Sequence, residues 1–279
     1  MANKRSQQEH QGPQRQPALG NNTMPQKFTY GLLILSFSAS LIGCRGNQDD
    51  PPEEISKLRA LGVVASKLTT GPSTALPLDT ITLTVHAAAP KGTQIAVSTF
   101  ADSPSSFAVP VETAVVPGTE TYDTQYESLD LYSASVLLTI PPATALKFPA
   151  GRRFVSLRYG IELTAGAESE RIVGSLPVYE PGAPEIDLWK PMNIDIVKPI
   201  GGITLGNETE EDLEGTITKN TEENVRVGWY VTGGLVKNRR AKSTSWETPA
   251  AKGKHLVILT ARGLNTGAFA IKTAEVVVD

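Results

Sequence analysis

From Leu58 onward, the apolar residues of this chain recur at every second position. Ile81, Leu83 and Val85, for example, alternate with threonines. Successive side chains of a β-strand point to opposite faces, so this period predicts strands with one buried face. The same alternation marks residues 58–66, 95–97, 132–140, 155–163, 171–178, 194–196, 225–231, 256–260 and 269–278. No comparable stretch between Leu58 and Val178 shows a helical stripe, so the pattern predicts an all-β fold of antiparallel β-sandwiches.

Turn-forming residues divide these strands into two groups. Pro181 and Pro184 follow the first group, and Pro191 precedes the second. Domain boundaries fall in such proline- and glycine-rich linkers. We therefore expect two β-sandwich domains in tandem, the first over 56–184 and the second over 192–279, and we expect the second to fold on its own.

Residues 101–130 interrupt the alternation of the first domain. The segment is rich in Ser, Pro, Thr and Glu and carries Tyr122 and Tyr126. Connections of this length are uncommon in compact domains and are sometimes functional. The segment is therefore the candidate binding loop of the first domain.

The stretch before the strands contains thirteen uncharged residues, 31–43, after a positive charge at Lys27. As a helix it would rise about 20 Å, short of the ~30 Å hydrocarbon core of a bilayer. A positive end, an apolar centre and small final residues are the layout of a secretory signal peptide. We interpret 1–43 as a signal peptide with a disordered, Gln- and Asn-rich start, translated from either Met1 or Met24.

This segment ends in Leu41-Ile42-Gly43-Cys44, which resembles the lipobox of bacterial lipoproteins. The resemblance implies cleavage between Gly43 and Cys44, a diacylglyceryl group on the Cys44 thiol, and acylation of the new amino terminus, for example by palmitate. Two or three acyl chains anchor a protein stably, whereas one chain does not. Because Cys44 is the only cysteine of the chain, the alternative is an unmodified thiol in an ordinary signal segment.

The residues after Cys44 predict a tether and a location. Residues 45–54 are polar or are Gly and Pro, so we interpret 44–55 as a lipid-anchored tether. The residue after the cysteine is Arg45, whereas Asp at this position often signals inner-membrane retention in enterobacterial lipoproteins. By that resemblance we expect the outer membrane, contacted through the lipid on Cys44.

The charge balance limits the classes of partner. The chain carries 26 basic and 29 acidic residues, and the expected signal peptide removes four basic residues but only one acidic residue. The mature chain would therefore be acidic, which argues against non-specific nucleic-acid binding. A single cysteine allows no disulfide within the chain, so each domain must be held by its own core.

Three segments of the second domain resemble the immunoglobulin-like and PKD-like modules of bacterial surface proteins. These segments are 227–234, 245–249 and 253–260. The resemblance implies an Ig-like β-sandwich with Trp229 in its core and a corner between Trp246 and Pro249. It also implies an adhesive, spacer or partner-binding role. We expect Trp189, like Trp229, to be a packing residue and not a ligand platform.

The sequence offers few candidate catalytic or metal-binding residues. His86 and His255 have no Glu or His at a metal-ligand spacing, so structural or exposed roles are favoured over ligand or base roles. No Gly-x-Ser-x-Gly elbow occurs. An acidic run lacks the pattern of a calcium loop and is interpreted as a solvated turn or short helix in preference to a cation site. Its members are Glu208, Glu210, Glu211, Asp212 and Glu214. We therefore predict no catalytic residue, metal site or cofactor.

Four basic residues within six positions form the strongest positive feature of the chain. They are Lys237, Arg239, Arg240 and Lys242. They follow a Gly-Gly pair and precede Trp246, which predicts the tip of a hairpin. Such a loop usually serves solubility. The alternative is a patch for anionic lipid head groups, lipopolysaccharide or glycan chains.

These features predict a lipid-anchored protein of the bacterial envelope that acts as a non-enzymatic binding, adhesive or structural module. Its partner would be an envelope protein or a glycan. The alternative is an enzyme, or an enzyme-accessory domain, that acts on envelope polymers. An enzyme would require a deep polar pocket that gathers His86 or His255 with carboxylates. The sequence leaves the oligomeric state open.

Overall fold

The structure is a computed structural model that describes residues 54–67, 74–101, 108–111, 113–183, 192–218, 224–264 and 268–279. Every helix or strand assigned within these ranges is a β-strand, which confirms the predicted all-β fold. No helix in these ranges is long and apolar enough to span a membrane. The predicted signal peptide, Cys44 and Trp189 lie outside the described residues.

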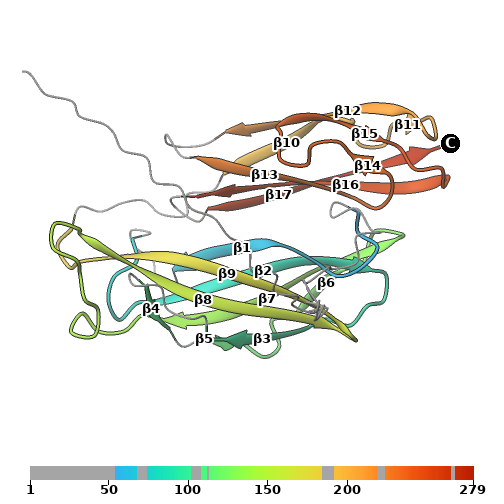
Figure 1. The fold of residues 1–279 in the computed structure, drawn as a ribbon. Coiled ribbons are helices and arrows are strands. Elements are labelled where there is room, and N and C mark those ends of the chain that lie inside the picture. The colour runs from blue at the N-terminus through green and yellow to red at the C-terminus, as the bar shows by residue number, and fades with distance from the viewer. Residues whose placement is uncertain are drawn as a thin grey trace, which may run out of the picture. The chain divides into compact units, whose positions relative to one another are not determined.

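Two sheets form the first sandwich (Figure 1). The five-stranded sheet has the order β1-β2-β7-β5, and β6 also pairs with β7. Its strands are β1 (Arg59–Lys67), β2 (Thr80–Pro90), β5 (Thr113–Val115), β6 (Thr121–Asp123) and β7 (Leu129–Thr139). The four-stranded sheet has the order β3-β8-β4, and β9 pairs with β8. Its strands are β3 (Ala96–Phe100), β4 (Ala108–Pro110), β8 (Phe154–Ala165) and β9 (Glu168–Tyr179).

The alternating apolar faces of the long strands meet between these two sheets. Leu83 and Val85 of β2 are fully buried, and so are Leu157 and Ile161 of β8. Burial of one such side chain stabilises the fold by about 1.5–3 kcal/mol, so these faces fix which side of each strand points inward. The chain changes sheets after β2, because β3 pairs with β8 and not with β2.

The second sandwich also consists of two sheets, and each of them has four strands. One has the order β10-β12-β15-β14 and contains β10 (Asn193–Lys198), β12 (Glu210–Thr218), β14 (Leu235–Val236) and β15 (Ser243–Glu247). The other has the order β11-β17-β16-β13 and contains β11 (Thr204–Leu205), β13 (Val225–Val231), β16 (Gly253–Gly263) and β17 (Phe269–Val278). Trp229 and Trp246 are fully buried in the core between these sheets, which confirms the predicted packing role of Trp229.

Most of the acidic run is a strand: Glu208 lies in a turn as predicted, but for the residues from Glu210 onward the predicted turn or short helix is wrong. From Glu210 onward the run forms β12, whose ladder to β15 is continuous. Leu213 is fully buried, while Glu210 and Asp212 on the opposite face are exposed. Neighbouring lysines balance the charge, because Lys198 Nζ lies 3.2 Å from an Asp212 oxygen and Lys237 Nζ lies 2.5 Å from Glu210 Oε1. The ladder and one buried leucine therefore outweigh the low strand propensity of acidic residues.

The segment predicted as a candidate binding loop, 101–130, contributes the edge strands β4, β5 and β6, and residues 102–107 within it lie outside the described ranges. Tyr122 packs edge-on against Tyr132 at 5.0 Å, and its hydroxyl accepts a hydrogen bond from Ile95 N at 2.9 Å. The Tyr126 hydroxyl lies 3.0 Å from Thr273 Oγ1 of β17. Both tyrosines are therefore used in packing.

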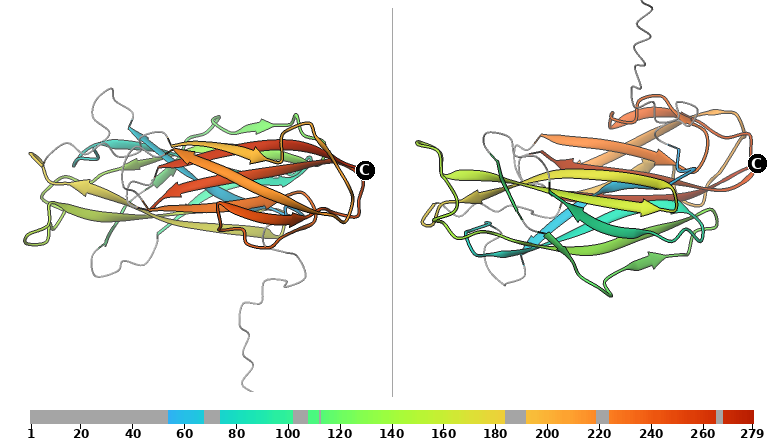
Figure 2. Two further views of the ribbon diagram at one scale, coloured as in Figure 1. Left: turned by 90° about the horizontal axis from the view of Figure 1, so that it is seen from above. Right: turned by 60° about the horizontal axis from the view of Figure 1, so that its bottom comes forward.

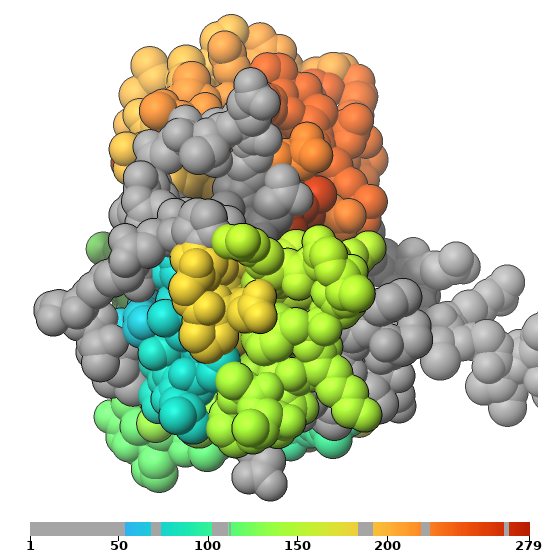
Figure 3. Space-filling model, turned by 90° about the vertical axis from the view of Figure 1, so that its left-hand side faces the viewer, coloured from blue at the N-terminus to red at the C-terminus, as the bar shows by residue number. Residues whose placement is uncertain are grey.

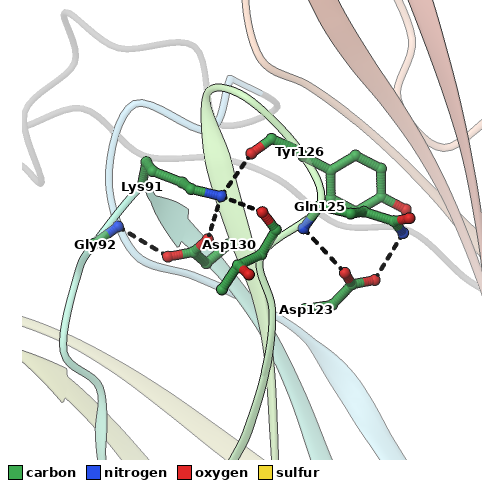
Figure 4. Close-up of polar contacts among 7 residues, drawn as sticks. Lys91, Gly92, Asp123, Gln125, Tyr126 and Asp130 are labelled. Carbon is green, nitrogen blue, oxygen red and sulfur yellow. Dashed lines mark hydrogen bonds and ion pairs between the residues drawn. The ribbon is translucent and has the colours of Figure 1, made fainter.

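A lysine clamp holds the end of this segment (Figure 4). Lys91 Nζ donates to the backbone oxygens of Thr124 and Tyr126 and lies 3.1 Å from Asp130 Oδ1. The other Asp130 oxygen accepts a hydrogen bond from Gly92 N at 2.8 Å. The Asp130 side chain is only 6% exposed, so its charge depends on Lys91.

Replacing Lys91 with methionine is expected to lower the free energy of unfolding by about 2 kcal/mol, because a buried carboxylate would lose its cation. The Lys91→Met/Asp130→Asn variant removes both charges and should recover part of this loss. Urea denaturation of the full chain measures both values. A Lys91→Met variant as stable as the wild type would show that the clamp contributes nothing to stability.

An apolar layer joins the two sandwiches, and residues 47–279 belong to one compact unit. The first sandwich contributes Leu61 and Leu129, and the second contributes Leu256, Ile258 and Phe269. Strand β1 contacts both β16 and β17. In Figure 1, β1 lies on the side of the first sandwich that faces β17, and Figure 2 shows the ribbon from two further sides. In Figure 3 the dark red start of β17 lies at the boundary between the two sandwiches.

The end of the predicted tether also packs in this layer. Ile55 is 5% exposed, and its backbone N donates to Val231 O of β13 at 2.8 Å. The packed part of the chain therefore begins before β1. Independent folding of 192–279 stays a prediction, and that fragment alone would expose the apolar face of β16 and β17.

Candidate functional site: an arginine crevice

Two arginines stand opposite each other at one end of the sheet of the second sandwich that faces the first. Arg226 of β13 is the register partner of Arg262 of β16, and Arg262 is the register partner of Phe269 of β17. Residues directly opposite on paired strands point to the same face, with Cβ atoms about 4.5–5.5 Å apart. The three side chains therefore form a row across the sheet, two positive charges beside an aromatic ring.

A glycine keeps the next position of this face open. Gly228 is opposite Thr260, whose Oγ1 donates to Gly228 O at 3.1 Å. A Cβ at residue 228 would lie 2.7 Å from Thr260 Oγ1 and 3.2 Å from a ring carbon of Tyr230. Any side chain there would therefore fill the space between the Arg226 row and Tyr230.

The basic loop 237–242 is the predicted hairpin connection, between the paired strands β14 and β15. Its backbone is fixed to the core tryptophan, because Trp229 N donates to Arg239 O at 2.9 Å and Trp229 Nε1 donates to Ala241 O at 2.8 Å. Lys242 O also accepts a hydrogen bond from Gly215 N at 2.9 Å. The loop is therefore held against β12 and β13, and its position is set by the core.

The structure divides the four basic residues predicted as one patch. Arg239 and Arg240 line a crevice with Arg226 and Arg262. Lys237 is instead paired with Glu210, and this hydrogen bond is the largest cause that lowers the pKa of the Glu210 carboxyl. Lys242 is exposed and does not line the crevice. Two of the four predicted residues therefore line the crevice together with Arg226 and Arg262, and their role as a patch for an anionic partner stays a prediction.

We call this cavity the arginine crevice. It has a volume of about 180 Å³. Its lining residues are Leu61, Arg226, Val227, Gly228, Tyr230, Arg239, Arg240, Thr260, Arg262 and Phe269. None of these described lining residues is acidic, and Leu61 is the only one of them that the first sandwich contributes. Among the described residues, no carboxylate forms an ion pair with Arg226, Arg240 or Arg262.

Tyr230 of the second sandwich and the ion pair of Arg59 with Glu170 in the first sandwich also affect the charge near the crevice. Burial raises the pKa of Tyr230, while the nearby Arg239 lowers it, so the hydroxyl is a neutral donor at physiological pH. Burial also raises the pKa of Glu170, opposed by Arg59, whose Nη1 lies 3.8 Å from Glu170 Oε1. Glu170 acts on Tyr230 as well, so its charge reaches this region.

A second crevice, of about 200 Å³, brings together the residue types of a catalytic triad. His86, Asp123 and Ser133 all line it. Their hydrogen bonds lead elsewhere, because Ser133 Oγ lies 2.7 Å from Thr121 Oγ1 and Asp123 accepts bonds from the backbone and side-chain nitrogens of Gln125. A general base must lie within hydrogen-bond reach of the group it deprotonates. This arrangement does not connect the three residues.

The two histidines have structural contacts. The His86 ring stacks on Phe269 with centroids 5.8 Å apart, and burial lowers the pKa of His86. His255 Nε2 lies 2.9 Å from Ala251 O, and His255 Nδ1 lies 3.4 Å from Thr232 Oγ1. Within the described ranges, no group of three or more His, Cys, Asp or Glu residues is arranged to hold a metal ion.

Comparisons with known proteins do not assign the chain to a family. A scan against protein-family models and a search of curated proteins found no match. Fibronectin(III)-like modules of CbhA from Clostridium thermocellum align over 77% of this chain and 94% of theirs, with a TM-score of 0.31 and 14% identity. The N-terminal Ig1-2 module of the Drosophila receptor protein tyrosine phosphatase DLAR aligns over 77% of this chain and 99% of its own, with a TM-score of 0.25 and 11% identity.

One further solved structure matches a smaller part of the chain. It is a nucleoside hydrolase-related hypothetical protein from Saccharophagus degradans, with a TM-score of 0.27 and 11% identity. The match covers 32% of this chain and 25% of that one, so the chain spans about a quarter of it. The class of this protein is defined by its own strand pairing, which makes it an all-β protein of two sandwiches.

Proposed function

We propose that this protein is a lipid-anchored lipoprotein of a bacterial envelope that acts there as a non-enzymatic binding module for an anionic partner. The arginine crevice is the observation that carries the binding role, because its described lining contains four arginines and no carboxylate. Guanidinium groups recognise carboxylates and phosphates through two parallel hydrogen bonds. Acidic envelope glycans and envelope proteins with acidic surfaces are partners of this chemistry.

The lipobox resemblance at Leu41-Ile42-Gly43-Cys44 supports the anchoring role. A lipid on Cys44 would hold the two sandwiches within a tether length of the membrane surface, and Arg45 favours the outer membrane. A binding module gains from such an anchor, because confinement near the partner raises the effective concentration of each for the other.

The alternative, an enzyme or enzyme-accessory domain that acts on envelope polymers, would rest on the second crevice, which is lined by His86, Asp123 and Ser133. Their hydrogen bonds to Thr121 and Gln125 favour binding over catalysis at this place. The described lining of the arginine crevice likewise offers cations and neutral hydroxyls, and no carboxylate or imidazole among these residues could act as a general base.

Replacing Cys44 with serine is expected to abolish lipid attachment and membrane retention, because the serine has no thiol to receive the diacylglyceryl group. In cells fed radiolabelled palmitate, the wild-type protein should be labelled and should sediment with the envelope. The Cys44→Ser protein should stay unlabelled and keep the mass of the uncut precursor. Palmitate in the Cys44→Ser protein would contradict the proposed anchor.

A further inference from the structure

We propose that the arginine crevice binds an oxyanion-bearing sugar unit, a carboxylated or phosphorylated residue of an acidic glycan, and that this ligand contacts both sandwiches. The proposal names the ligand class of the function proposed above and rests on it.

The first step of the argument is the charge left uncompensated in the crevice. Arg226 and Arg262 are direct cross-strand partners, and like charges in such positions repel each other. No described carboxylate pairs with either side chain. An oxyanion placed between the two guanidinium groups would replace this repulsion by two attractions, whereas a neutral ligand would leave it in place.

The second step is the shape and polarity of the lining. Leu61 is 7% exposed and Phe269 is 8% exposed, and both give the crevice an apolar wall. A bare inorganic anion would leave this wall without a partner, while the carbon face of a sugar ring can pack on it. The volume of about 180 Å³ lies below the ~300–1,000 Å³ of sites for drug-sized ligands, so the crevice accommodates about one sugar unit.

The third step is the set of neutral hydrogen-bonding groups. The Tyr230 hydroxyl and the Thr260 hydroxyl line the same space as the arginines. Thr260 Oγ1 donates to Gly228 O, so its lone pairs are available to accept a bond from a ligand hydroxyl. The arginines can bind the acidic group of a ligand, and the two hydroxyls can bind its sugar hydroxyls. This mixed lining therefore suits an acidic sugar.

The fourth step concerns the position of the crevice between the sandwiches. Leu61 belongs to β1 of the first sandwich, whereas the arginines belong to the second. The ring of Phe269 lies against Gly62, where an added Cβ would be only 2.1 Å from a ring carbon. The site is therefore complete only when the sandwiches are packed together. A ligand bound there should raise the melting temperature of the whole unit, and the rise should grow with the ratio of ligand concentration to dissociation constant.

Isothermal titration calorimetry of the full chain in a nonionic detergent tests the proposal. The probes are glucuronate, glucose 6-phosphate, inorganic phosphate and glucose. Glucuronate or glucose 6-phosphate should bind at least about tenfold more tightly than phosphate or glucose, because only the charged sugars offer both groups the crevice recognises. The stronger of the two charged sugars then identifies the preferred oxyanion.

A matched pair of double variants distinguishes binding at a specific site from a general effect of positive charge on affinity. Arg226→Gln/Arg262→Gln should weaken the charged sugar at least about tenfold, because it removes charge-assisted hydrogen bonds. Lys237→Gln/Lys242→Gln removes the same charge from outside the crevice and should change affinity less than about twofold. Without ligand, the arginine variant should melt about 1–3 °C higher, because the cross-strand repulsion is gone.

A carboxylate near the crevice offers a test in the opposite direction. Besides burial, the charge of Glu170 contributes to the raised pKa of Tyr230, and Glu170 Oε1 lies 3.8 Å from Arg59 Nη1. Glu170→Gln removes this negative charge and should raise the affinity for the charged sugar about two- to fivefold.

Equal losses in the arginine and lysine variants, or equal binding of glucuronate and glucose, would overturn the proposed sugar site. Phosphate that binds as tightly as both charged sugars would also overturn it, since the apolar wall would then contribute nothing. These failures differ from failure of the proposed function. If only the sugar ligand is wrong, the wild-type protein would still be labelled with palmitate and would still attach to the envelope in a salt-sensitive way, and the arginine variant would lose that attachment.

Discussion

Replacing Trp229 with alanine is expected to lower the free energy of unfolding by about 3–5 kcal/mol. The indole is fully buried between the sheets of the second sandwich, so its removal leaves a large cavity. Its Nε1 also donates to Ala241 O at 2.8 Å, and that oxygen would lose its donor. Domains are stable by only about 5–15 kcal/mol, so this loss removes a large share of the stability.

The Trp229→Phe variant separates packing from hydrogen bonding. It keeps most of the apolar volume but removes the donor to Ala241 O, so we expect a smaller loss of about 1–2 kcal/mol. Because the same bond fixes the loop that carries Arg239 and Arg240, affinity of the crevice for a charged sugar should also fall. Urea denaturation followed by circular dichroism measures the stabilities. A loss below about 1 kcal/mol in Trp229→Ala would contradict the core assignment.

Replacing Gly62 with valine is expected to lower the free energy of unfolding by about 3 kcal/mol, at the upper end of the range for overpacking. Gly62 lies at an irregularity in the pairing of β1 with β2, and the Phe269 ring occupies the space that a side chain would need. A Cβ there would lie 2.1 Å from Phe269 Cε2. Since Phe269 is buried, the ring cannot move without separating β1 from β17.

A compensating change checks this explanation. Phe269→Ala removes the ring, so Gly62→Val/Phe269→Ala should be less destabilised than the sum of its two single variants. Such coupling is expected only between residues that are in contact. Additive effects would show that Gly62 matters for a reason other than the Phe269 ring.

The long strands could be predicted from the sequence because each has one face in a core. Leu83, Leu157 and Ile161 occupy alternate positions, and all are fully buried. Burial imposes this pattern directly on the residue types, so the period appears without knowledge of the partner strand. The position of Trp229 followed from the same alternation.

Strand β12 could not be predicted in the same way. It has one fully buried side chain, Leu213, and its outward positions carry acidic residues that disfavour strands. The ladders to β10 and β15 form it, together with the lysines that pair with Glu210 and Asp212. Each of these partners is distant in the sequence.

Two of the four arginines of the crevice, Arg239 and Arg240, belong to the basic run of the sequence. The run 237–242 is visible as a local cluster of charge, and its place in a hairpin followed from turn residues and the strands around it. Arg226 and Arg262 become neighbours only through the register of β13 with β16, which no local pattern specifies. The alternation does place Arg226 on the outer face of its strand, so a predicted register would have revealed the pair.

The most direct test of the binding role is the spectrum of arginine side-chain Nε–H groups in the isotope-labelled full chain, titrated with glucuronate and with glucose 6-phosphate. The account predicts that the Nε signals of Arg226 and Arg262 shift together and saturate with one dissociation constant for at least one of these sugars. Arg153, an exposed residue outside the crevice, should not respond at the same concentrations. Unchanged signals of Arg226 and Arg262, or equal shifts at Arg153, would contradict the crevice as the binding site.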